Sequence, residues 1–188
     1  MNKSIIFILL LLTYNIVASA SSQTTTDHSI TIFIHGTTPI RKFLEYSPAR
    51  PFMYAPQGLN LAKELPHNYH FHKIAQNCVD LNAKSYSLDQ FYIFGWKSEK
   101  VYDSTRQQAA QDLVNELQKL VNGYYLEHHV IPRVQLIGFS HGGNVVLNTA
   151  NYLPLIVQNK KIKVEAWLFG TPVQQVNCDL INSDTARF

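Results

Sequence analysis

The stretch Ile131–Asn144, reading IPRVQLIGFSHGGN, decides the fold that we expect for this chain. A short apolar run at 134–137 leads directly into the pentapeptide GFSHG at 138–142, and a helix-like segment follows from Gly143 to Leu153. A strand, a Gly-x-Ser-x-Gly turn and a helix in this order indicate a nucleophile elbow. In such a turn a strained backbone raises a serine hydroxyl above the end of a parallel sheet.

The two glycines of the pentapeptide, Gly138 and Gly142, fit this interpretation because side chains there would collide where strand and helix nearly touch. The alternative is a glycine-rich turn that happens to contain a serine. The flanking strand and helix favour the catalytic interpretation, since structural context is what gives a short motif its meaning.

Residues 1–20 have the pattern of a signal peptide. Lys3 supplies the positive start, Ile5 to Leu12 the apolar core, and Ala18-Ser19-Ala20 the small-residue cleavage site. The apolar run is shorter than the roughly 20 residues of a membrane span, and no later stretch approaches that length. We therefore expect an exported protein, secreted or periplasmic, with no transmembrane segment after signal removal.

Residues 21–188 contain no repeat or linker and predict a single domain. The formal net charge of the full chain is only +3, and no Lys/Arg cluster marks a nucleic-acid footprint. Cys78 and Cys178 would persist as a disulfide in an oxidising compartment, but two separate thiols fit the spacing equally well.

The rest of the chain alternates between apolar runs and helical patterns. Strands are expected at Ile30–Ile34, at Gln90–Trp96, in the elbow and at Val164–Phe169. Helices are expected at Leu59–Leu65, at Phe71–Leu81, and from a cap at Asp103, Ser104 or Thr105 to a stop at Gly123, with Ser104 and Gln107 fitting a capping box. Strands separated by helices predict an α/β fold, a three-layer α/β/α sandwich with a mostly parallel sheet.

At this point the chain resembles the α/β-hydrolase family, and more closely its lipase-like members. The matching features are the His35-Gly36-Thr37 turn, the elbow at 138–142 with its helix, and Phe169-Gly170-Thr171-Pro172. The resemblance implies a lipase or esterase whose serine is acylated by a small-molecule or lipid ester and then hydrolysed, with no cofactor. An acyltransferase would share the same acyl-serine intermediate.

The chemistry assigns the roles. Ser140 is the candidate nucleophile, and it needs a histidine as base and a carboxylate to orient that histidine. The oxyanion needs two backbone N–H groups, for which His141 and Thr37 are the candidates. The aromatic stretch with Tyr46, Phe52, Met53 and Tyr54 would form a lid or acyl pocket, or simply pack over the sheet.

The other histidines have structural explanations. His35 is expected to shape the turn after its strand, and His141 is excluded as the base because it neighbours Ser140 in a tight turn. His67, His70 and His72 could suggest a metal site, but no local cysteine or carboxylate completes it, so a solvated loop and no metal is the prediction. His128 and His129 are expected at the surface.

The family order is serine, acid, histidine, and no histidine follows His141 in this sequence. Asp179 and Asp184 are the only late carboxylates. We therefore expect an α/β-hydrolase-like domain that is incomplete at its C-terminus, an impaired enzyme, with a non-catalytic binding protein or pseudoenzyme as the alternative. The same reasoning leaves the strand Val164–Phe169 as an uncovered apolar edge, which predicts a marginal fold and self-association through that strand.

Overall fold

The computed structural model describes residues 28–37, 48, 55–100 and 102–173. The predicted signal peptide, the four candidate lid residues, Cys178 and both late aspartates lie outside the described residues. The predictions made for them therefore stay predictions.

A five-stranded sheet with the order β2-β3-β1-β4-β7 forms the centre of the molecule. Its four parallel strands are those expected from the sequence: β1 Ser29–Ile34, β3 Phe91–Gly95, β4 Arg133–Phe139 and β7 Val164–Phe169. These runs are rich in β-branched and aromatic residues, which suit strands covered on both faces. In register, Ile32 on β1 lies between Tyr92 and Leu136.

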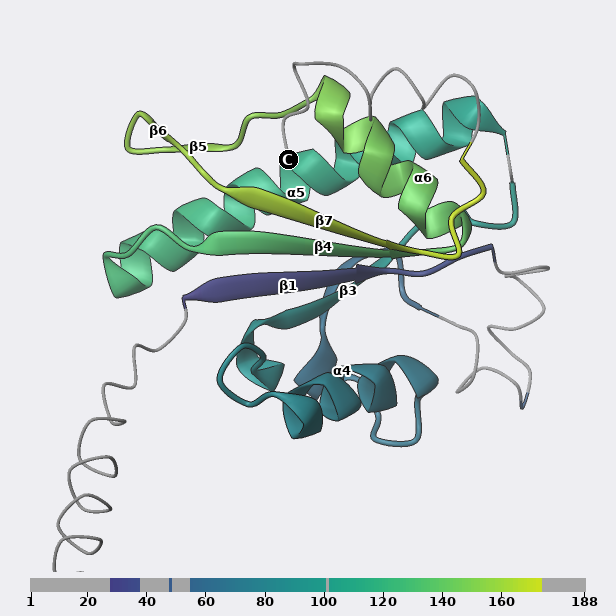
Figure 1. Cartoon of the computed structure of the whole chain (residues 1–188), viewed down its shortest axis with the longest axis horizontal. Coiled ribbons are helices and arrows are strands. Elements are labelled where there is room, and N and C mark those ends of the chain that lie inside the picture. Colours follow the sequence, from purple (N-terminus) through teal and green to yellow (C-terminus); the bar gives the residue numbers. More distant parts are fainter. Residues whose placement is uncertain (1–27, 38–47, 49–54, 101, 174–188) are drawn as a thin grey trace, which may run out of the picture.

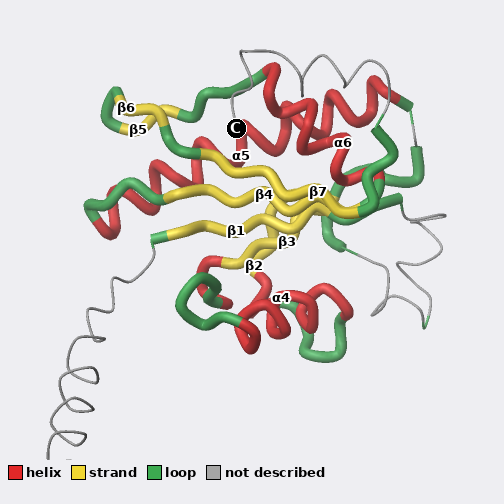
Figure 2. Tube along the Cα trace, in the orientation of Figure 1, coloured by secondary structure: helices red, strands yellow, loops and turns green. Residues whose placement is uncertain are grey.

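Helices lie on both sides of this sheet (Figures 1 and 2). The helices α5, Asp103–His128, and α6, His141–Asn148, pack on one face, and α4, His70–Leu81, covers part of the other. The strand residues alternate accordingly: Ile30, Ile32 and Ile34 join the core under α5 and α6, while Phe33 joins the smaller core under α4. The chain therefore has an α/β fold with a mostly parallel sheet.

The predicted helix at Leu59–Leu65 is wrong. This segment forms β2, Gly58–Leu61, which pairs antiparallel with β3, and then a short 3-10 turn, Ala62–Glu64. The Asn60 side-chain amide donates to the carbonyls of Pro56 and Gly58. Such local hydrogen bonds from a side chain to the backbone compete with helix formation and favour a non-helical backbone here. The expected sheet was mostly parallel, but no strand was expected in this segment, so the antiparallel edge strand β2 is a difference from the prediction.

The predicted stop at Gly123 is also wrong, because α5 continues to His128 and ends with His129 in the left-handed region at φ 55°. Packing of Val121 and Tyr124 against the core outweighs the cost of one glycine, about 1 kcal/mol. The expected capping box is absent as well. Tyr102 is the N-cap, it makes no side-chain cap bond, and the Asp103 carboxylate instead accepts from Gln107 at 2.7 Å.

A small hairpin, β5 Ile156–Val157 and β6 Lys160–Lys161, connects α6 to β7. Its turn residues Gln158 and Asn159 have φ of 50° and 60°, as a two-residue hairpin turn requires. The Gln118 side chain of α5 binds both backbone groups of Ile156, at 2.8 and 3.0 Å, and so fixes the hairpin on the helix. Two further 3-10 turns complete the described elements, Leu88–Gln90 and Thr149–Asn151.

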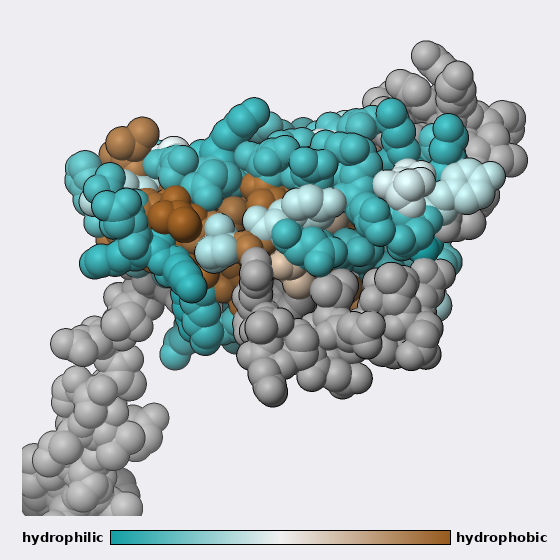
Figure 3. All heavy atoms as spheres, turned by 90° about the horizontal axis from the view of Figure 1, so that it is seen from above, coloured by the Kyte–Doolittle hydropathy of each residue, from teal (hydrophilic) through white to brown (hydrophobic). Residues whose placement is uncertain are grey.

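The surface seen from above is mostly hydrophilic (Figure 3). An apolar patch lies toward the end of the molecule where Figure 1 shows the hairpin and the end of α5. Ile156 and Leu126 are exposed on these two elements. Among the described residues no helix combines the length and the apolar character that a membrane crossing needs. Cys78 on α4 is a free, half-buried thiol whose pKa is raised by burial.

Candidate active site

Ser140 lies between the last residue of β4, Phe139, and the first residue of α6, His141. Its backbone has φ 52° and ψ −128°. This conformation is outside the left-handed helical region that a few side chains tolerate, and it costs a non-glycine residue about 1–3 kcal/mol. The strand, sharp turn and helix expected from the sequence are thus present, with the serine at the strained position.

Two backbone hydrogen bonds hold this turn. The Ser140 N–H donates to the carbonyl of Phe169 on β7 at 2.9 Å, and the Gly143 N–H donates to the Ser140 carbonyl at 3.0 Å. The sheet and the first turn of α6 therefore fix the strained residue from both sides. A strained conformation persists only where its surroundings determine it in this way.

Both predicted elbow glycines lie where backbones approach closely. A Cβ on Gly138 would lie 2.5 Å from Gly143 Cα. A Cβ on Gly142 would lie 2.3 Å from the carbonyl oxygen of Ile34 and 2.5 Å from that of His35. No side chain fits these distances, so α6 can approach β4 and β1 only if both positions are glycine.

The loop after β1 reaches Ser140 directly. A Cβ on Gly36 would lie 2.8 Å from Ser140 Cβ and 3.3 Å from Ser140 Oγ, so the backbone at Gly36 touches the serine side chain. Thr37, the candidate second oxyanion donor, is the next residue and is half-buried. The sequence reasoning assigned no contact to Gly36, although its place between His35 and Thr37 offered the signal.

His35 shapes this loop. Its ring is buried, and Nδ1 donates to the Gly36 carbonyl at 2.7 Å, which fixes the proton on that nitrogen because a carbonyl only accepts. The His35 carbonyl accepts a hydrogen bond from Trp96 Nε1 at 2.9 Å. These contacts fit the structural role predicted for this histidine.

His141 has a half-buried imidazole next to a buried cation. Burial lowers its pKa, and the positive charge of Arg106 on α5 lowers the pKa further, so the ring is neutral at pH 7. Arg106 is itself buried, and its Nη2 lies 3.4 Å from the Asp103 carboxylate. A neutral imidazole carries no positive charge to offer an oxyanion, so the backbone N–H of His141 is its candidate contribution.

Thr171, which follows β7, packs on the start of α6. A Cβ on Gly143 would lie 1.8 Å from Thr171 Oγ1, and the Asn144 side chain donates to the Pro172 carbonyl at 3.1 Å. Within the described part of the chain, Thr171 Oγ1, Thr37 Oγ1 and His141 Nδ1 are buried without a hydrogen-bond partner. Buried polar atoms are seldom left unpaired, and these three belong to segments that meet at Ser140.

No hydrogen bond joins Ser140 Oγ to any of the eight histidines of the chain, all of which the structure describes. His67 and His72 instead form a pair, with Nδ1 of the first 3.0 Å from Nε2 of the second, and His72 Nδ1 donates to the Ala62 carbonyl. Among described residues no group of three or more potential metal ligands occurs. His128 and His129 are exposed, as predicted.

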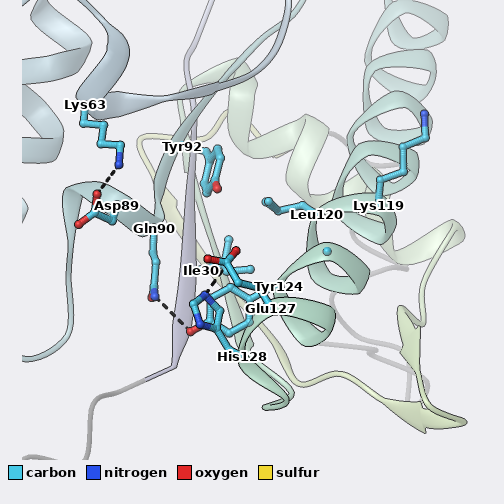
Figure 4. A pocket seen from close by; sticks show the side chains of 11 residues that line it. Ile30, Lys63, Asp89, Gln90, Tyr92, Lys119, Leu120, Tyr124, Glu127 and His128 are labelled. Atoms are coloured by element: carbon cyan, nitrogen blue, oxygen red, sulfur yellow. Dashed lines mark hydrogen bonds and ion pairs between the residues drawn. The ribbon is translucent and has the colours of Figure 1, made fainter.

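A separate groove of about 740 Å³ lies between α5 and the amino ends of β1 and β3 (Figure 4). The ion pair Lys63–Asp89 lies on one wall, and Tyr124, Glu127 and His128 from α5 form the other. Ser140 follows the carboxyl end of β4, so this groove is at the opposite end of the sheet from the serine. The groove therefore plays no part in the chemistry of Ser140.

Comparisons with protein-family models, with curated proteins and with solved structures found no match to this chain. The geometry around Ser140 is therefore the basis for a functional assignment.

Proposed function

We propose that this chain is an exported serine hydrolase of the lipase or esterase type, with Ser140 as the nucleophile and a small-molecule or lipid ester as substrate. The observation that carries the proposal is the backbone of Ser140, with φ 52° between a strand and a helix. Strained serines at such junctions expose their hydroxyl above the sheet, which is the arrangement that acyl transfer needs. Export rests on the pattern of residues 1–20 alone.

An α/β-hydrolase-like, three-layer arrangement belongs to the same proposal. The mostly parallel sheet, the helices on both of its faces and the position of Ser140 after the carboxyl end of β4 support it. In parallel α/β sheets, reactive groups gather at the carboxyl ends of the strands, where loops from several strands meet.

In the proposed reaction Ser140 Oγ attacks the ester carbonyl carbon, the alcohol leaves with a proton, and water then releases the carboxylic acid and restores the hydroxyl. The backbone N–H groups of His141 and Thr37 would stabilise the oxyanion. The contact between Gly36 and the Ser140 side chain supports this, because it places the residue before Thr37 against the nucleophile. One such donor contributes about 3 kcal/mol to transition-state stabilisation.

One observation favours the alternative, a non-catalytic binding protein or pseudoenzyme. No histidine of the chain is hydrogen-bonded to Ser140 Oγ, so the base of a triad is not identified among the described residues. Without a base, the oxyanion donors and substrate binding alone still accelerate the reaction about 10³–10⁴-fold over water. We therefore expect slow acylation and poor turnover.

A fluorophosphonate probe separates the two functions. Under the hydrolase proposal, incubation of the purified chain labels Ser140, and peptide mass spectrometry finds the adduct there in preference to the exposed Ser87. The Ser140→Ala variant is the control and loses the label. If the folded protein reacts no faster at Ser140 than at Ser87, the binding alternative is favoured and the hydrolase is excluded.

A further inference from the structure

Two histidines from adjoining segments face each other where α4 begins. His67 lies in the turn that leads into the helix, His72 lies in the first helical turn, and His67 Nδ1 is 3.0 Å from His72 Nε2. The sequence predicted a solvated loop for this segment, but His72 is buried while His67 is exposed. The pair therefore has one ring held inside the protein and one ring open to solvent.

A hydrogen bond from its far nitrogen fixes the His72 ring. His72 Nδ1 donates to the Ala62 carbonyl at 2.9 Å, so in the neutral ring the lone pair is on Nε2, which faces His67. Ala62 is fully buried in the 3-10 turn Ala62–Glu64. Histidines that bind metals usually donate from their other nitrogen to a carbonyl or carboxylate, which sets the tautomer and the ring orientation. His72 already has this support.

The two rings are bent toward each other. A straight N–H···N bond of this length would place the ring centroids about 5.3 Å apart, since each nitrogen lies about 1.15 Å from its ring centre. The centroids are only 4.6 Å apart, with the ring planes at 89°. Both lone-pair directions can then meet at one point beside the line between the nitrogens.

This separation suits a shared metal ion. An ion about 2.1 Å from each nitrogen, at their separation of 3.0 Å, has an N–metal–N angle of about 90°, as six-coordinate ions require. A tetrahedral angle needs a separation of about 3.4 Å, which a small outward movement of the exposed His67 ring supplies.

We propose that His67 and His72 bind one divalent transition-metal ion, of the class of Zn²⁺, Ni²⁺ and Cu²⁺. Imidazole nitrogen is a preferred ligand of these ions, whereas Mg²⁺ and Ca²⁺ prefer oxygen. The described residues contain no group of three or more potential ligands, so water completes the coordination. In the metal-free pair His67 Nδ1 supplies the shared proton. On binding, this proton moves to the other nitrogen of the His67 ring, and both facing nitrogens then present lone pairs to the ion.

The bound ion joins the turn before α4 to the helix itself. Phe71, the neighbour of His72, has its ring centroid 5.4 Å from that of His35, whose Nδ1 donates to the Gly36 carbonyl. The site therefore stabilises the start of the helix that packs against the residues after β1. This role is structural and does not depend on Ser140 being a nucleophile.

Isothermal titration calorimetry of the purified chain, without an affinity tag and freed of metal by EDTA and dialysis, tests the site with ZnCl₂ and NiCl₂. We expect one ion per chain and no binding of MgCl₂. His67→Gln removes an exposed ligand and should weaken binding about tenfold or more. The matched control is His70→Gln, which removes another exposed histidine of this segment and should bind as the wild type does.

Cu²⁺ gives a second measurement, because its electron paramagnetic resonance spectrum shows splitting from directly bound nitrogens. We expect two imidazole nitrogens in the wild type and one in His67→Gln, with circular dichroism verifying that each variant folds. His72→Gln should show the same loss, and if this buried change prevents folding, His67→Gln decides. A wild-type chain that binds no ion at about 1 mM metal overturns the proposal, as does a His67→Gln variant that binds as tightly as His70→Gln.

Discussion

Ser140 adopts a conformation that glycine would adopt at lower cost, and the chain nevertheless carries serine there. Strain at this φ and ψ costs about 1–3 kcal/mol, while a glycine loses about 0.5–1 kcal/mol of backbone entropy. If the side chain were only structural, this strain would have no compensating gain. The conformation of this residue is thus evidence for a role of its hydroxyl.

We predict that Ser140→Gly raises the free energy of unfolding by about 1 kcal/mol, because strain relief exceeds the added entropy cost. Ser140→Ala is the control: it removes the hydroxyl but keeps the Cβ, so it should bring no comparable gain. Urea unfolding of the three proteins measures the difference. Equal stability of the glycine and alanine variants would show that the turn is unstrained.

Among the elements, the approach of α6 to β4 and β1 positions Ser140. We predict that Gly142→Ala lowers the free energy of unfolding by about 2 kcal/mol or more, because its Cβ would lie 2.3 Å from the Ile34 carbonyl oxygen. Fluorophosphonate labelling of Ser140 should fall as well, since the helix must move away from the loop that carries Gly36.

The matched control is Gly123→Ala in α5, where nothing lies within 4 Å of an added Cβ. This change should raise stability by about 0.5–1 kcal/mol through helix propensity and leave labelling unaffected. Thermal unfolding followed by circular dichroism compares the two. A Gly142→Ala variant as stable as Gly123→Ala would contradict the close approach.

The elements that were predictable are those with a strong local pattern. The apolar strands β1, β3, β4 and β7 and the helix α4 follow from their sequences, and Val164–Phe169 matches its prediction to the residue. The end of α5 was not predictable from Gly123, because tertiary packing of Tyr124 overrides that local signal. The strand β2 depends on its pairing with β3, which no local pattern contains.

In the molecule as a whole, the parallel sheet brings the ends of β1, β4 and β7 together, and with them Thr37, Ser140 and Thr171. The sequence predicted the serine and its glycines because their requirement is local to one turn. It could not predict that Gly36 touches the Ser140 side chain or that Thr171 covers the first turn of α6. Both contacts join segments that are far apart in the chain, so they depend on the register of the sheet.

The most direct measurement of whether Ser140 is a nucleophile is the detection of its acyl adduct. We predict that p-nitrophenyl butyrate transfers one butyryl group to the peptide containing Ser140, seen by mass spectrometry after acid quench, because oxyanion stabilisation assists acylation while release by water is slow. Ser140→Ala should carry none. A folded wild-type chain without this adduct, or an equal adduct on the Ser140→Ala variant, would contradict the assignment of Ser140 as the nucleophile.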